Sequence, residues 1–128
     1  MGANLDRVQV IKGWIDADGN TQEKVYDVAW SDDREMDASG KLPPVGNTVD
    51  VTTTHYSNSI GAAQLATVWE DPDFDAALNA FYYVRVLEIP TPRHSLFDAL
   101  ALELTAEDTG WPATIQERAY SSPIWYTP

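Results

Sequence analysis

The strongest hydrophobic run of the chain spans residues 81–89, where three aromatic and four aliphatic residues are interrupted only by Arg85 and Glu88. Aromatic and β-branched residues at this density favour a β-strand. Pro90 and Pro92 end it, because proline cannot donate a ladder hydrogen bond. A strand that is apolar on both faces is typical of the centre of a packed sheet. The pattern therefore predicts a central, buried strand that carries two charges.

Alternating hydrophobic and polar positions near the N-terminus predict two further strands. Residues 7–15 form the first, with an irregularity expected at residues 12–13, and residues 24–30 form the second. The stretch between them, residues 16–20, is rich in Asp, Gly and Asn, which supply the backbone angles of a turn. These segments are expected to make an antiparallel hairpin with a longish loop.

The middle of the chain mixes polar loops with weaker strand patterns. Residues 31–47 are polar and contain glycine and proline, which predicts a loop and the segment most apt to be mobile. Residues 48–56 alternate Thr and Val and predict a strand. Residues 62–70 fit either a helix or a strand, with the strand favoured. Residues 70–75 have the composition of a turn.

The C-terminal third predicts one helix and a return to strands. Leucines spaced four apart predict a helix over residues 95–104, with Ser95 as its N-cap. Residues 113–126 have strand character. If residues 81–89 pair with residues 115–120, Glu88 and Arg118 meet as an internal salt bridge. Six or so short strands with one helical insertion predict a mainly β fold, a β-sandwich formed by a single domain of residues 1–128.

Composition removes several classes of function. The chain carries 20 Asp and Glu against 8 Lys and Arg, a net charge of −12, which repels phosphate backbones and argues against nucleic-acid binding. The absence of cysteine excludes disulfides, thiol nucleophiles and thiolate zinc sites. No apolar run is long enough to span a membrane and the N-terminus is not a signal peptide, so we expect a soluble protein that makes no membrane contact, in a compartment left open.

Charged residues on or beside the predicted central strand are the best candidates for a site, because buried charges need partners. The favoured interpretation is an internal ion-pair network. The alternative is a polar cluster in which a histidine acts as acid or base and an arginine holds an anion. The candidates are Arg85, Glu88, Arg93, His94, Glu117 and Arg118.

Two further chemistries remain open as minor alternatives, although no cofactor or metal is predicted. A Schiff base, including pyridoxal-phosphate-dependent amine transfer, would have to use one of the three lysines, Lys12, Lys24 or Lys41. Lys12 is the one whose strand position could bury it. Alternating acidic turns could hold a divalent cation weakly, at Asp16, Asp18 and Asn20 or at Asp71, Asp73 and Asp75.

Several long blocks of sequence resemble a known bacterial family. They are "NLDRVQVIKGW", "EKVYDVAWS", "VGNTVDV", "VWEDPDFD", "AFYYVRVLEIPTPR" and "TIQERAYSSPIWYTP". Together they are similar to the C-terminal region of the domain-of-unknown-function family 3604. "YYVRV" followed by "SSPIW" also looks like the last strands of immunoglobulin-like or fibronectin-like sandwiches, which implies such a fold, in an incomplete form.

The resemblance carries implications for function. Longer members of that family resemble PHP-like metal-dependent hydrolases whose metal-binding residues lie in an N-terminal barrel that is absent here. It implies a tail module without its own metal site, which packs against that hydrolase domain or forms a homo-oligomer, because exposed apolar surface is normally covered. The alternatives are a small oligomeric enzyme with a pocket between subunits and a weak cation-binding protein.

Overall fold

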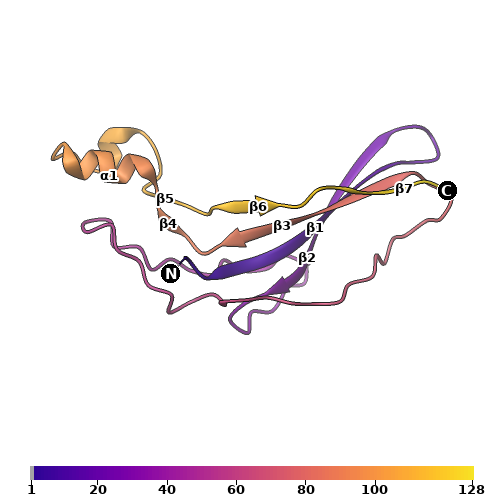
Figure 1. Ribbon diagram of the computed structural model, residues 1–128, viewed down its shortest axis with the longest axis horizontal. Coiled ribbons are helices and arrows are strands. Elements are labelled where there is room, and N and C mark those ends of the chain that lie inside the picture. Colours follow the sequence, from indigo (N-terminus) through magenta and orange to yellow (C-terminus); the bar gives the residue numbers. More distant parts are fainter. Residues whose placement is uncertain (1) are drawn as a thin grey trace.

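The structure is a computed structural model that describes residues 2–128, and it is mainly β with an open, sandwich-like arrangement (Figure 1). One antiparallel sheet has the strand order β2-β1-β3-β6, with β7 also paired to β3. Its strands are β1 (Leu5–Ile15), β2 (Thr21–Trp30), β3 (Ala80–Glu88), β6 (Arg118–Tyr120) and β7 (Ile124–Tyr126). The remaining elements are β4 (Thr91–Pro92) paired with β5 (Thr114–Ile115), the helix α1 (His94–Ala101) and the short 3-10 helix η1 (Glu107–Thr109).

The predicted N-terminal hairpin is confirmed as β1 and β2. Asp16 shapes its turn, because one carboxylate oxygen accepts from the backbone N–H groups of Asp18 at 3.0 Å and Asn20 at 2.8 Å. The irregularity expected at residues 12–13 is wrong. The register shifts lie at Val8/Gln9 toward β2 and at Leu5/Arg7 toward β3.

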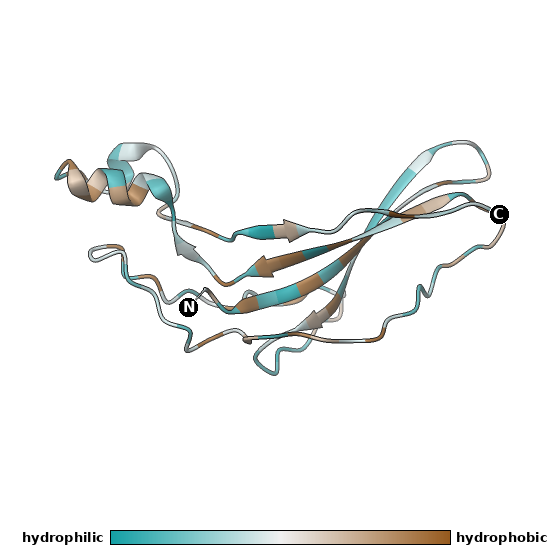
Figure 2. Cartoon of the chain, viewed as in Figure 1, coloured by the Kyte–Doolittle hydropathy of each residue, from teal (hydrophilic) through white to brown (hydrophobic). Residues whose placement is uncertain are grey.

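The predicted central strand is confirmed as β3, which lies between β1 on one side and β6 and β7 on the other. Its predicted burial is wrong over most of its length. Ala80 is buried, but every later residue of β3 is only half-buried. Figure 2 shows this strand as largely hydrophobic, so much apolar surface on it is only partly covered.

The long connection between β2 and β3 contains no strand, so the strands predicted over residues 48–56 and 62–70 are wrong. A turn interrupts the first, because the Asp50 carboxylate accepts from the backbone N–H and hydroxyl of Thr52 and from the hydroxyl of Thr53. These bonds lower the pKa of Asp50 to about 2. The second segment, residues 62–70, runs as extended, irregular chain along the sheet (Figure 1). The loop predicted over residues 31–47 is confirmed as irregular; its mobility stays a prediction.

The C-terminal elements agree with the prediction except in detail. The helix begins at His94 and ends at Ala101, so it is shorter than residues 95–104. Its N-cap is Arg93, which contradicts Ser95; the Ser95 hydroxyl is buried and has no hydrogen-bond partner within the described chain. The pairing of β3 with the segment at residues 115–120 is confirmed through β6.

Few side chains are fully buried. The buried apolar residues are Ile11, Leu42, Val45, Ala80, Ile89, Leu96 and Ala99. A second buried group surrounds the Asp6 carboxylate, which accepts from Arg34 at 2.7 Å, Gln116 at 2.8 Å and Arg7 at 3.1 Å. This network ties the first part of the long connection to β1.

Within residues 2–128, none of the helices has the length and apolar character needed to cross a membrane.

Strand alternation divides the sheet into two faces with different coverings. On the first face, the register aligns Lys24, Lys12 and Tyr82 across β2, β1 and β3. Residues 65–79, which we name the strap, cover this face. On the other face, the register aligns Phe81 with Trp125 and Arg85 with Tyr120.

Gly13 lets the ring of Phe81 approach the backbone of β1 closely, and this contact gives the first prediction. A Cβ at this position would collide with the ring of Phe81. Gly13→Ala is therefore expected to lower the free energy of unfolding by about 1–3 kcal/mol, although Gly→Ala in an unconstrained strand stabilises. Urea unfolding measures this, with Gly2→Ala as the matched control because nothing lies within 4 Å of its added Cβ. Equal stability of the two variants would contradict the packing of Phe81 over β1.

Candidate functional site

A group of charged side chains joins the strap to the sheet, and we name it the Lys12 cluster. Lys12 is 4% exposed, and its ammonium donates to the Asp71 carboxylate at 2.5 Å and to the Asp73 carbonyl at 2.7 Å. Tyr82 donates to the same Asp71 carboxylate at 2.7 Å. The other members are Lys24 and Tyr26, which both donate to the Asp73 carboxylate.

The aromatic ring of Trp69 completes the attachment of the strap. Its ring centroid lies 5.0 Å from that of Tyr26 and 6.5 Å from that of Tyr82. Lys12 also lies over the rings of Trp14 and Tyr82, at 5.1 and 5.8 Å from their centroids. The cluster therefore combines an ion pair, hydrogen bonds and aromatic contacts in one place.

Hydrogen bonding sets the ionisation of the cluster. Burial alone would raise the pKa of Asp71, but the hydrogen bonds from Lys12 and Tyr82 outweigh it and hold that pKa below the usual range. Hydrogen bonds from Lys24 and Tyr26 lower the pKa of Asp73 in the same way. Burial, together with hydrogen bonds to these ionised carboxylates, raises the pKa of the Tyr26 and Tyr82 phenols.

The three lysines considered for covalent chemistry occupy different environments. A Schiff base requires an amine with a free lone pair, whereas the amine of Lys12 donates to two acceptors. Lys24 is half-exposed in its ion pair with Asp73. Lys41 is exposed in the loop before Leu42. The geometry of Lys12 is that of a structural ammonium.

The candidate charged residues do not converge into one site. Arg85 and Arg118 lie near Tyr120 on the face opposite the strap. Arg93 stacks over Trp111 with its guanidinium carbon 5.0 Å from the ring centroid. His94 is exposed at the start of α1 and lies 3.1 Å from Asp98.

The predicted salt bridge between Glu88 and Arg118 is wrong. No ion pair joins them within residues 2–128. The register places Arg118 opposite Leu87, whereas the Glu88 N–H donates to the Glu117 carbonyl. Glu88 and Arg118 therefore leave the sheet on opposite faces.

The acidic turns are engaged with protein donors. Asp71 and Asp73 accept from the ammonium and phenol groups of the Lys12 cluster, and Asp75 accepts from the backbone N–H of Ala77. Asp16 closes the hairpin turn. In the part of the chain that the structure describes, no three His, Asp or Glu side chains form a group able to hold a metal ion.

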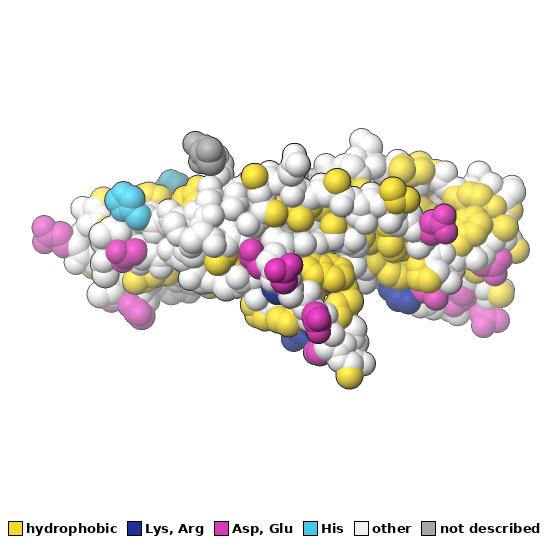
Figure 3. Space-filling view, turned by 90° about the horizontal axis from the view of Figure 1, so that it is seen from below, with side chains coloured by type: hydrophobic (Ala, Val, Ile, Leu, Met, Phe, Trp, Pro, Cys, Tyr) yellow, Lys and Arg dark blue, Asp and Glu magenta, His cyan; other side chains and the backbone are white. Residues whose placement is uncertain are grey.

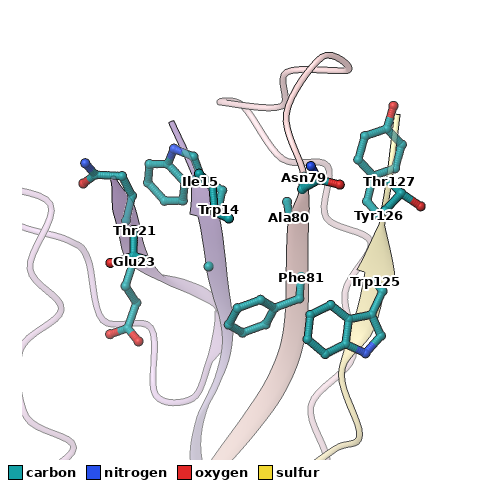
Figure 4. A pocket seen from close by; sticks show the side chains of 12 residues that line it. Trp14, Ile15, Thr21, Glu23, Asn79, Ala80, Phe81, Trp125, Tyr126 and Thr127 are labelled. Carbon is teal, nitrogen blue, oxygen red and sulfur yellow. The ribbon is translucent and has the colours of Figure 1, made fainter. Parts of the chain in front are cut away.

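A continuous row of aromatic side chains covers the face opposite the strap, and we name it the aromatic face: Phe81, Tyr83, Tyr120 and Trp125. Neighbouring rings lie with centroids 5.2 to 6.4 Å apart. Trp125 is 72% exposed and Tyr120 is 57% exposed. Figure 4 shows the Phe81 ring directed toward β1 and beside Trp125.

Two open grooves flank β3 and β7. One, of about 580 Å³, is lined on the aromatic face by Phe81 and Trp125 and at its rim by Ile15, Thr21 and Glu23 (Figure 4). The other, of about 640 Å³, lies between the strap and the sheet. Figure 3, seen from the strap side, shows exposed hydrophobic side chains interspersed with acidic groups. Apolar surface is thus exposed on both sides of the sheet.

Arginines lie at one end of the aromatic face. A hydrogen bond from Arg118, supported by the charge of Arg85, lowers the pKa of the Tyr120 phenol.

The candidate residues predicted from the sequence did not include the aromatic face as a site. The sequence does contain a signal for it. Phe81, Tyr83 and Arg85 are spaced two apart in a strand, so they share one face of the sheet.

These observations define an open, mainly β module that combines a strap-covered face with an exposed aromatic face. A family model matches residues 1–128, and the chain belongs to that family, described as a protein of unknown function (DUF3604). The family resemblance is therefore confirmed. Its finer parts, the C-terminal placement and the hydrolase-like relatives, stay predictions. No curated protein and no solved structure matches the chain significantly.

The Lys12–Asp71 pair is expected to anchor the strap. Asp71→Ala should lower the free energy of unfolding by about 3–5 kcal/mol, because it leaves a buried ammonium without its carboxylate. The double variant Lys12→Met/Asp71→Leu should be more stable than Asp71→Ala, because no charge is left unpaired. Denaturant titration measures both, with the exposed Asp18→Ala as the control. A cost for Asp71→Ala equal to that of the control would refute the anchoring role.

The raised phenol pKa values predict a loss of stability at alkaline pH. The unfolded state releases tyrosine protons near pH 10, while the folded state retains those of Tyr26 and Tyr82. Stability from these groups is therefore complete below about pH 10 and is lost as the pH rises above it. Tyr82→Phe should reduce the slope of unfolding free energy against pH in this range. An unchanged slope would show that the Tyr82 phenol titrates alike in both states.

Proposed function

We propose that this chain is a non-catalytic structural and interaction module of its family. Its aromatic face is a docking surface that associates with a second copy of the chain. The observation that carries the proposal is the continuity of the rings of Phe81, Tyr83, Tyr120 and Trp125, of which the first two are half-buried and the last two exposed. We further propose that residues 1–128 act as one domain whose sheet is half of an immunoglobulin-like sandwich.

The size of the exposed patch supports an interface. Covering the exposed parts of four aromatic side chains removes on the order of 400 Å² from water. This area lies within the range of roughly 300–600 Å² for the largest apolar patch of a typical monomer, and such a patch is often functional. Val25 and Ile15, 42% and 47% exposed on the same face, extend the patch further. Aromatic residues of this kind dominate the energy of protein interfaces.

The charge of the chain sets the conditions under which such association is measured. At a net charge of −12, two copies repel each other over long distances. Salt near 0.15 M shortens that repulsion to roughly 8 Å, so apolar contact prevails at short range. Association should therefore strengthen between low and physiological salt.

An N-terminal hydrolase domain of the parent protein would use the same face, and it would then compete with the second copy.

A substitution in the centre of the patch tests the proposal. Trp125→Asp should weaken self-association at least about tenfold, because it removes an exposed aromatic anchor and adds repulsion. Sedimentation equilibrium over a range of protein concentrations gives the dissociation constants. Circular dichroism confirms that the variant folds, which is expected because Trp125 is mostly exposed.

The matched control is Val68→Asp, which adds the same charge at a residue that is 95% exposed and lies in the strap. It should associate like the unsubstituted chain, apart from the small effect of one extra charge. A chain that stays monomeric at all concentrations, or equal weakening by both substitutions, would overturn the proposal.

A further inference from the structure

Two arginines beside the aromatic face have no carboxylate partner. Within residues 2–128, neither Arg85 nor Arg118 forms an ion pair, although the chain has 20 acidic residues and only 8 Lys and Arg. Arg118 is exposed at the edge of the sheet in β6. In so acidic a molecule, two unpaired guanidinium groups on one face form a local site for carboxylates.

A row of hydrogen bonds fixes the orientation of Arg85. Its Nε donates to the Gln9 Oε1 at 2.8 Å, and the Gln9 amide nitrogen donates to the Asp27 carboxylate at 2.8 Å. Gln9 is 8% exposed, so its amide is held in place. The bond to Gln9 restricts the Arg85 side chain before binding, which lowers the entropic cost of ordering it around a carboxylate.

The complementary surface lies in the same chain, on residues 94–110, which we name the helical lobe. It carries four carboxylates, at Asp98, Glu103, Glu107 and Asp108, and no Lys or Arg. It also exposes large apolar side chains: Phe97 49%, Leu100 37%, Leu102 69% and Leu104 45%. Figure 1 shows the lobe at one end of the elongated molecule and β7, which bears Trp125, at the other.

We propose that the helical lobe of one copy docks on the aromatic face of a second copy, with lobe carboxylates meeting Arg85 and Arg118. This inference rests on the proposed function and deepens it by naming the segment that covers the face. Apolar residues on both surfaces supply burial, and the opposite charges select the pairing. The contact is heterologous, because it joins two different patches of the same chain.

A heterologous contact has a distinctive signature in mixing experiments. Leu102→Lys disables the lobe and Trp125→Asp disables the aromatic face, and each variant alone should associate at least about tenfold more weakly than the unsubstituted chain. In an equimolar mixture, the intact lobe of the Trp125→Asp chain meets the intact face of the Leu102→Lys chain. Sedimentation velocity should then detect a mixed dimer that neither variant forms alone.

The matched control is Val68→Lys, which should leave association unchanged and rescue neither variant. If Trp125→Asp weakens association and Leu102→Lys does not, the lobe is not the occupant, and the proposed function stands with a face-to-face contact. If both weaken association but the mixture stays monomeric, the two patches do not meet each other. If neither has an effect, the proposed function fails as well.

Cross-linking gives an independent readout in the unsubstituted chain. Mass spectrometry with mixed isotope labels identifies cross-links between Glu103 of one copy and residues of the aromatic face of another.

Discussion

A single antiparallel sheet has two faces, and the rest of this chain has enough structure to cover only one of them well. The strap covers that face, and it lacks regular backbone hydrogen bonds, so side chains must hold it. The buried ion pair between Lys12 and Asp71 provides this attachment from the centre of the sheet, with Tyr82 and Trp69 around it. Within residues 2–128 the opposite face has no comparable cover, and Tyr120 and Trp125 remain exposed there.

The same ion pair explains why a buried lysine need not indicate catalysis. A charge in a partly dry environment requires a partner and satisfied hydrogen bonds. Lys12 has both, and its carboxylate partner is in turn bonded by a tyrosine. The aromatic face shows the reverse situation, because it carries exposed apolar groups and two arginines that form no ion pair within the described chain. An exposed apolar patch marks an interaction surface, whereas a buried charge that already has its partners does not.

The elements set by local pattern could be predicted from the sequence. Alternation gave the β1–β2 hairpin and the run at residues 81–89 gave β3, because each depends on neighbours within a few residues. The strand expected at 48–56 failed because the Asp50 carboxylate accepts from the backbone N–H of Thr52 and closes a turn there. The strand expected at 62–70 failed because Trp69 packs against β2 and β3 from the strap. Lys12, Asp71 and Asp73 were all candidates, but their meeting joins residues 59 or more apart, which spacing cannot reveal.

The central claim is that the aromatic face is covered when copies associate, and hydroxyl-radical footprinting measures it directly. The oxidation rates of Trp125 and Tyr120 are compared between dilute and concentrated protein, with Val68 as the internal reference. The account predicts that both aromatic residues are protected in the associated protein while Val68 reacts equally in both samples. Equal oxidation of Trp125 and Tyr120 in associated and dissociated protein would contradict it.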